Sequence, residues 1–203
     1  MGVLADTHCP EFMDELPAAV FEAFTGVDLI IHAGDITGEE TLRALSRIAP
    51  VKAVRGDHDK LLRDLPKSIE FDVEGHRVAV IHGNRNRLIE EPVTFIGTIT
   101  LGHLWFAPRL RDWLARRFPA ADVIIYGHTH HAVSVRSGDR FFFNPGAVYQ
   151  VTEAAAQRRL ARRPNWFEWT WLQVARHRRT ALRHSVGILE IDHRTVRGHI
   201  IRI

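Results

Sequence analysis

Seven side chains that can bind metal ions occur in short motifs spread over the first two thirds of the chain. They are Asp6, His8, Asp35, Asp57, His82, His128 and His130. Three carboxylates and four imidazoles make a mixed oxygen and nitrogen donor set, which suits Mn, Fe, Zn or Ni better than Ca or Mg. Seven donors exceed what one tetrahedral ion uses. We therefore expect two divalent metal ions that share one carboxylate, with Mn²⁺ favoured.

Two metal ions roughly 3.5–4 Å apart are a known arrangement for the hydrolysis of phosphate esters. Such a pair generates hydroxide near neutral pH and neutralises charge on the phosphoryl oxygens. A protonated imidazole near the leaving oxygen would then act as general acid. His58 stands beside Asp57 and is the histidine left over for that role.

The metal-binding residues come directly after short apolar segments that we predict to be strands. These segments are Gly2–Ala5, Leu29–Ala33, Val51–Val54, Arg77–Ile81, Val123–Tyr126, Arg140–Phe143 and Val186–Ile191. Several are apolar throughout, which favours strands buried on both faces. In open α/β sheets, ligands bind at the carboxyl ends of the strands. The sequence therefore predicts that these side chains meet at one edge.

Two segments between the first strands are predicted to be helices, namely Glu11–Phe24 and Glu39–Ile48, with Thr37 as a cap for the second. The alternating order of strands and helices indicates an α/β layered fold. From Ile69 onward the strands lie close together in the sequence, so antiparallel pairs are possible there. No internal repeat is visible.

Several motifs in a fixed order resemble those of the calcineurin-like metallophosphoesterases, in particular their small bacterial and archaeal phosphodiesterase branch. They are Asp6-x-His8, Gly34-Asp35, Gly56-Asp57-His58-Asp59, His82-Gly83, Gly127-His128-Thr129-His130 and Asn144-Pro145-Gly146. The resemblance covers about residues 2–150 and a closing hairpin near 186–203. It implies a four-layer αββα sandwich of two mixed sheets.

The resemblance also implies roles for single residues. One metal would be held by Asp6, His8, Asp35 and His130, and the other by Asp35, Asp57, His82 and His128. His58 would be the general acid, and Asp59 would orient it. The family usually has Asn where this chain has Asp57, which adds a negative charge beside the metals.

A phosphodiesterase acting on a small phosphate ester is the leading hypothesis, because diesters have poor leaving groups that need an acid such as His58. A phosphomonoesterase is the near alternative. A non-catalytic protein-binding scaffold of the same fold, like a retromer-subunit relative, is the alternative from another class. Substrate contacts are proposed for His103, Arg85 and His131, and Arg87 lies in the same stretch as the first two. We expect His32 to pack or hydrogen-bond rather than to bind metal.

The chain of 203 residues is expected to form a single metallophosphoesterase domain, 1–203, with a helical insertion at 151–184. This insertion is rich in Arg and Trp and contains eight Arg against two Glu, although the net charge of the whole chain is only +3. It predicts a cap or a homo-oligomer contact, with a nucleic acid or a membrane surface as weaker alternatives. Within it, helices are predicted over Thr152–Arg163 and Trp166–Arg183.

Cys9 is the only cysteine, and no signal peptide or membrane span is visible, so a cytoplasmic location is the default expectation.

Overall fold

A computed structural model of the chain describes residues 1–85, 110–151, 153–164, 166–177 and 183–203. Its strands are β1 (Gly2–Leu4), β2 (Ile30–His32), β3 (Val51–Ala53), β4 (Ser68–Val73), β5 (His76–Ile81), β6 (Val123–Tyr126), β7 (Ala132–Ser137), β8 (Arg140–Pro145), β9 (Ser185–Ile191) and β10 (Val196–Arg202). Its helices are α1 (Ala18–Ala23), α2 (Glu39–Leu45), α4 (Leu110–Arg117), α5 (Glu153–Ala161) and α6 (Trp166–His177).

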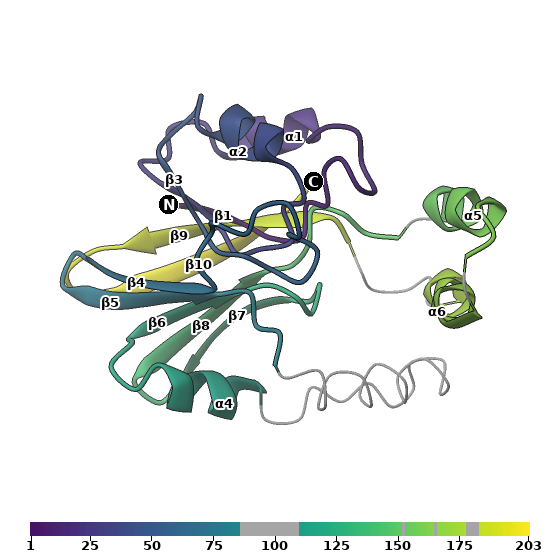
Figure 1. Cartoon of the computed structure of the whole chain (residues 1–203). Helices are drawn as coiled ribbons and strands as arrows, with labels where there is room; N and C mark the ends of the chain where they lie inside the picture. The colour runs from purple at the N-terminus through teal and green to yellow at the C-terminus, as the bar shows by residue number, and fades with distance from the viewer. Residues whose placement is uncertain (86–109, 152, 165, 178–182) are drawn as a thin grey trace. The chain divides into compact units, whose positions relative to one another are not determined.

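The strands form two mixed sheets of five strands each. The order in the first is β10-β9-β1-β2-β3, with β1, β2 and β3 parallel and β9 antiparallel to β1. The order in the second is β4-β5-β6-β8-β7, with β5, β6 and β8 parallel. Figure 1 shows the two sheets face to face, with α1 and α2 outside the first and α4 outside the second. The predicted αββα sandwich of two mixed sheets is confirmed.

Alternate side chains of the central strands enter two separate cores. Val3 and Ile31 pack with Val80 and Ile125 of the facing sheet, in the layer between the sheets. The neighbouring side chains of β1 and β2, among them Leu4, pack in the layer under α1 and α2. Side chains of successive residues in a strand point to opposite faces, so a strand buried on both faces must be apolar throughout. Burial on both faces therefore explains the continuous apolar runs in the sequence.

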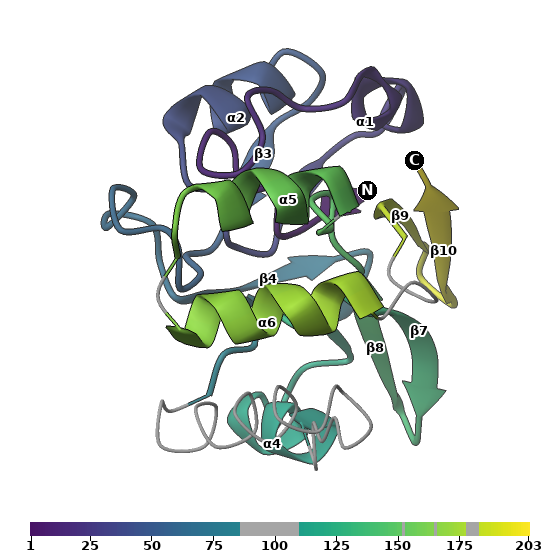
Figure 2. The same ribbon diagram turned by 90° about the vertical axis from the view of Figure 1, so that its right-hand side faces the viewer.

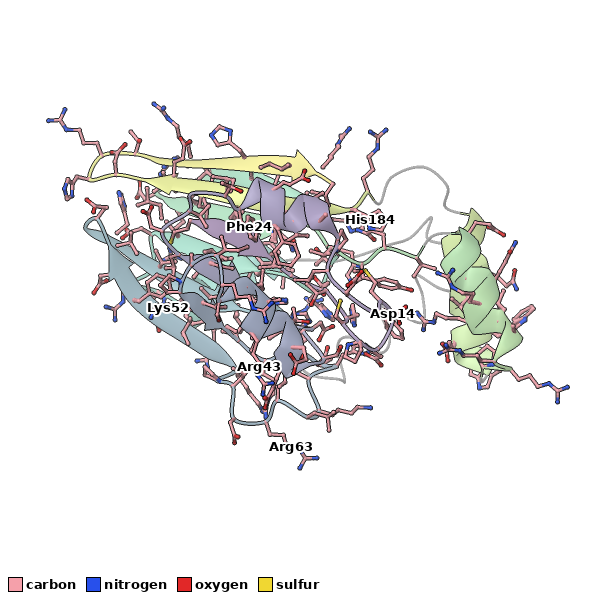
Figure 3. The ribbon with its side chains drawn as sticks, turned by 90° about the horizontal axis from the view of Figure 1, so that it is seen from above. Asp14, Phe24, Arg43, Lys52, Arg63 and His184 are labelled. Atoms are coloured by element: carbon pink, nitrogen blue, oxygen red, sulfur yellow. The ribbon has the colours of Figure 1, made fainter. Side chains whose placement is uncertain are left out.

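The predicted helix Glu11–Phe24 is wrong over its first part, because α1 begins only at Ala18. Pro17 precedes α1, and a residue before a proline is disfavoured in the α region. The segment before it is a turn in which the Phe12 N–H donates to the His8 carbonyl at 2.8 Å. At the other end of α1, Phe24 (Figure 3) is fully buried against the first sheet.

The predicted cap of the second helix is also wrong. Gly38, not Thr37, occupies the N-cap position of α2, so the helix begins without a side-chain cap hydrogen bond. Thr37 instead has a positive φ of 73° and donates its backbone N–H to Asp59. The strand-end loop before α2 is therefore shaped by a buried carboxylate from another loop.

The contacts of the chain divide it into two compact units, the second of which contains α5 and α6. These two helices lie side by side (Figure 2), and Arg159 of α5 forms an ion pair of 2.7 Å with Glu168 of α6. Helices were predicted in both places, although 152, 165 and 178–182 lie outside the described residues. The single domain and the role of 151–184 stay predictions.

Among the described residues, none of the helices combines the length and the apolar character needed to cross a bilayer.

The layer under α1 and α2 offers a direct test of the core. Leu45 is fully buried there, whereas the side chain of Leu61 is 87% exposed. Leu45→Ala should lower the free energy of unfolding by about 2–5 kcal/mol, because it removes apolar contacts and leaves a cavity. The matched control Leu61→Ala should change it by less than about 0.5 kcal/mol. Urea denaturation followed by circular dichroism measures both, and equal midpoints for the two variants would contradict this packing.

Candidate metal centre

The predicted metal-binding residues gather at the carboxyl ends of strands from both sheets. Groups of donor atoms within 4.8 Å of one another are formed by Asp6, His8 and His130, by Asp57, His82 and His128, and by Asp6, Asp35 and His82. The third group contains members of both others and adds Asp35. All seven side chains singled out in the sequence therefore meet in one cluster, and its donors divide into two overlapping sets.

Five of these seven residues have a backbone in the left-handed region, where non-glycine residues are uncommon. The φ angles are 52° for Asp6, 49° for His8, 56° for Asp35, 65° for His128 and 56° for His130. Such conformations persist only where the surrounding structure imposes them, and they concentrate at functional sites. The turns after β1, β2 and β6 are thus bent so that consecutive donors converge.

Asp35 has one carboxylate oxygen fixed by the backbone and the other directed at two imidazoles. Its Oδ1 accepts a hydrogen bond from the His58 N–H at 2.9 Å. Its Oδ2 lies 3.7 Å from His8 Nε2 and 3.4 Å from His82 Nε2. Since His8 and His82 belong to different donor groups, this oxygen lies where a shared carboxylate is expected.

The carboxylate of Asp6 is also held through one oxygen, with the other directed at an imidazole. Its Oδ2 accepts a hydrogen bond from the His128 N–H at 3.1 Å, and its Oδ1 lies 3.4 Å from His130 Nε2. The loop that carries these histidines is held by the buried amide of Asn144, which donates to the Gly127 carbonyl at 2.8 Å. The Asn-Pro-Gly motif therefore supports the His-x-His loop.

Glycines before two of the donors are required by close approach. A Cβ at Gly56 would collide with Oδ1 of Asp35. A Cβ at Gly34 would come within 2.7 Å of His82 Nδ1, and Gly34 also has a φ of +95°. Any side chain at either position would push apart the loops that bring the donors together.

The buried polar atoms of the donor set show whether it fits metal ions. Asp6 Oδ1, His8 Nδ1 and His82 Nε2 are buried and make no hydrogen bond to any of the described residues. Buried polar atoms are normally paired, and each unpaired one is costly. Their concentration among carboxylates and imidazoles fits a centre that is completed by cations.

His82 shows the fit most clearly. Its Nδ1 donates to the Ala33 carbonyl at 2.8 Å, which directs Nε2 toward Asp35. A metal-binding histidine typically donates its other ring nitrogen in this way. Burial lowers the pKa of His82, but the carboxylates of Asp35 and Asp6 outweigh burial and raise it to about 10. The position between His82 Nε2 and Asp35 Oδ2 thus favours a positive charge, which a proton or a metal ion can supply.

The same charges act on Asp35 in the opposite direction and lower its pKa. Burial alone would raise it, but the imidazoles of His82 and His8 lower it below the usual range for a carboxyl group. Asp35 therefore stays ionised while almost fully buried, and it is available as a negatively charged donor.

Asp59 was predicted to orient His58, and the structure corrects this assignment. The Asp59 side chain is buried, and its Oδ1 accepts backbone N–H bonds from Ile36 and Thr37, both at 2.7 Å. Its Oδ2 accepts from the N–H groups of Asp35 at 2.9 Å and Gly56 at 2.7 Å. Both oxygens are thus engaged by the backbone of two loops, so Asp59 is a structural clamp.

The partner of His58 is Glu11, which the sequence interpretation placed in a helix and did not consider as a site residue. Glu11 Oε2 lies 2.8 Å from His58 Nδ1 and 3.6 Å from His8 Nδ1. The hydrogen bond to Glu11 raises the pKa of His58. Burial raises and the imidazoles of His58 and His8 lower the pKa of Glu11, to a net value of about 2. The only hint in the sequence is an acidic residue three positions after His8.

The remaining predicted residues lie around or beyond this cluster. His32 is buried and hydrogen-bonds through Nε2 to Thr7 Oγ1 at 3.1 Å, as expected for a residue that does not bind metal. His131 is exposed, and its Nδ1 bonds the Thr129 carbonyl at 2.6 Å. Arg85 belongs to the second unit. His103 and Arg87 lie outside the described residues, so contacts of these residues with a substrate stay predictions.

With this geometry established, the relatives of the chain identify its class. The sequence model of the calcineurin-like phosphoesterase superfamily domain matches residues 1–161. A probable metallophosphoesterase of Methanothermobacter thermautotrophicus is 36% identical over 149 residues, which cover 72% of this chain and 76% of the relative. The chain therefore belongs to the calcineurin-like phosphoesterase superfamily, a class of metal-dependent phosphoric ester hydrolases.

Solved structures support the same fold. A Vps29 from Entamoeba histolytica, solved with Zn²⁺, has a TM-score of 0.65 and 17% identity, covering 99% of this chain and 97% of the Vps29 chain. An archaeal phosphodiesterase has a TM-score of 0.56 and 18% identity, covering 98% of both chains. At these identities the similarity concerns the fold alone.

The clamp role of Asp59 leads to a stability prediction. Asp59→Asn turns one acceptor of backbone N–H groups into a donor, so it should lower the free energy of unfolding by on the order of 3 kcal/mol. Asp64→Asn, an exposed change in the same loop, should have almost no effect. Urea unfolding of the metal-free proteins measures both. A variant as stable as the wild type would show that the four N–H groups do not depend on this charge.

Proposed function

We propose that the protein is a phosphodiesterase in which the Asp and His cluster holds two divalent metal ions. The observation that carries the proposal is the position of Asp35 Oδ2, which lies 3.7 Å from His8 Nε2 and 3.4 Å from His82 Nε2. A single carboxylate oxygen between two sets of imidazoles is the arrangement that two ions would share. The similarity in fold to an archaeal phosphodiesterase agrees with this proposal.

The proposed ligands divide into two sets around Asp35. The first set is Asp6, His8, Asp35 and His130, and the second is Asp35, Asp57, His82 and His128. When bound, the ions would lower the pKa of a water molecule and neutralise charge on the phosphoryl oxygens. The mixed donors suit Mn²⁺ and also Fe, Zn or Ni. Asp57 supplies a carboxylate where an amide is usual in the family, which adds to the attraction for cations.

The side chain of His58 is proposed to protonate the leaving oxygen. Its side chain is 41% exposed, so it can reach a substrate, and its raised pKa favours the protonated form that a general acid needs. Diester leaving groups are poor and gain most from protonation. This favours a diester over a monoester substrate.

A non-catalytic scaffold is the second candidate, favoured by the similarity in fold to Vps29. Turnover separates the two candidates. If metal-loaded protein hydrolyses neither phosphate diesters nor monoesters, the scaffold is correct and the enzyme proposal fails.

The first activity prediction concerns metal removal. Chelation followed by desalting should abolish hydrolysis of an aryl phosphodiester, and Mn²⁺ should restore it.

Asp35→Asn should lower bound metal and rate together, because Asp35 belongs to both proposed ligand sets. The control Asp139→Asn, in an exposed turn, should keep both. Metal content by atomic emission and initial rates are the measurements. Full metal content in Asp35→Asn would contradict the shared-carboxylate role.

The second activity prediction concerns His58. His58→Ala should lower kcat by roughly 10²–10⁴-fold for an ester with a poor leaving group and much less for a nitrophenyl ester, with metal retained. His193→Ala, in an exposed hairpin, is the control. An equal loss for both esters would argue against proton donation by His58.

A further inference from the structure

The side chains around His58 fix the ring from several directions. Its ring lies edge-on to His8 at a centroid distance of 4.7 Å and to Phe12 at 5.8 Å. The third contact is the hydrogen bond between its Nδ1 and Glu11 Oε2 at 2.8 Å. With Nδ1 engaged by Glu11, Nε2 is the ring nitrogen that remains to deliver a proton.

Glu11 reaches this position because of the turn directly after His8. The Phe12 and Met13 N–H groups both contact the His8 carbonyl, at 2.8 and 3.3 Å. The Glu11 N–H points to Thr37 Oγ1 at 3.5 Å. The turn thereby places the Glu11 carboxylate near the rings of both His8 and His58. A helix beginning at Glu11 would not have formed this turn.

A carboxylate at Nδ1 has a defined effect on an imidazole acid. It holds the Nδ1 proton in both protonation states, so the proton that leaves and returns is the one on Nε2. Asp59, the carboxylate next to His58 in sequence, is turned to the backbone of two other loops and has both oxygens engaged there.

We infer that Glu11 is the positioning residue of the general acid His58, in place of Asp59. This inference rests on the proposed phosphoesterase function. In the reaction step, a hydroxide ion derived from water forms a bond to phosphorus and the bond between phosphorus and the leaving oxygen breaks. His58 Nε2 gives its proton to that oxygen, which departs as an alcohol. The imidazole becomes neutral with its proton on Nδ1, still bonded to Glu11, and it regains the Nε2 proton from water.

The competing role for Glu11 is metal binding, since its carboxylate also forms a group of donors with His8 and His58. The two roles differ in what the isosteric change Glu11→Gln does. A ligand role would lower metal content, whereas a positioning role would leave metal content unchanged and lower only the step that needs the acid.

The kinetic test uses a phenyl phosphodiester and a p-nitrophenyl phosphodiester with Mn²⁺-loaded protein. Glu11→Gln should lower kcat for the phenyl ester by roughly 10- to 10²-fold, with KM and metal content unchanged and little loss on the nitrophenyl ester. Glu11→Asp should recover part of the rate. Glu15→Gln, an exposed acid of the same loop, is the matched control.

A double mutant separates positioning from an independent effect. In the His58→Ala background, Glu11→Gln should have no further effect on kcat, because its action passes through His58. A further loss of the same size, or a fall in metal content in Glu11→Gln alone, would overturn the inference.

The hydrogen bond between Glu11 and His58 can also be tested by NMR, without measuring hydrolysis. Long-range ¹H–¹⁵N spectra of Zn²⁺-loaded protein should show the His58 Nδ1 proton in the wild type and in Glu15→Gln, and its loss or shift in Glu11→Gln. Unchanged His58 signals in Glu11→Gln would overturn the inference even if the wild type hydrolyses neither ester. Lack of hydrolysis by the wild type would instead count against the proposed function.

Discussion

The carboxylate of Asp59 accepts hydrogen bonds from four backbone N–H groups that belong to the loops after β2 and β3. The short parallel strands before these loops fix β2 against β3, but their register does not extend to the turns beyond them. A buried charge in a nest of N–H groups is strong because it is fully paired and excluded from water. The loop that carries Asp35 and the loop that carries Asp57 and His58 are therefore placed by one side chain that contacts neither substrate nor metal in the proposed site.

The two carboxylates that are proposed to bind metal are held in the same way. Asp6 and Asp35 each use one oxygen to accept an N–H group from a different loop, which leaves the other oxygen directed at imidazoles. Fixing one oxygen removes the rotational freedom of the carboxylate, so its donor geometry exists before any cation arrives. The apolar sandwich makes this possible, because strands buried on both faces hold the turns at fixed positions. This fixed geometry has a cost in stability, visible as positive φ angles and as buried polar atoms that have no partner among the described residues.

Much of the geometry of the candidate site could be predicted from the sequence because the proposed metal ligands come directly after strands. Strand ends are recognisable from apolar runs such as those before Asp35 and His128, and the residues just beyond parallel strands meet at the carboxyl edge of the sheet. The role of Asp59 could not be predicted in this way, since acceptors of backbone N–H bonds leave no pattern in the sequence. Glu11 was missed for a related reason. Its segment has the composition of a helix, and only Pro17 and the turn at His8 show that the helix starts later.

These contacts separate the parts of the site that hold the fold from those that would act on a substrate. Asp59, Asp6 and Asp35 are buried and bonded to backbone, so losing any of them would disturb loops as well as chemistry. The side chains of Glu11 and His58 are 39% and 41% exposed, and they are bonded mainly to each other. A protein of this fold could exchange such a pair without weakening its core. Glu11 and His58 can therefore be substituted singly without removing a hydrogen bond that shapes the loops, which is not true of the buried carboxylates.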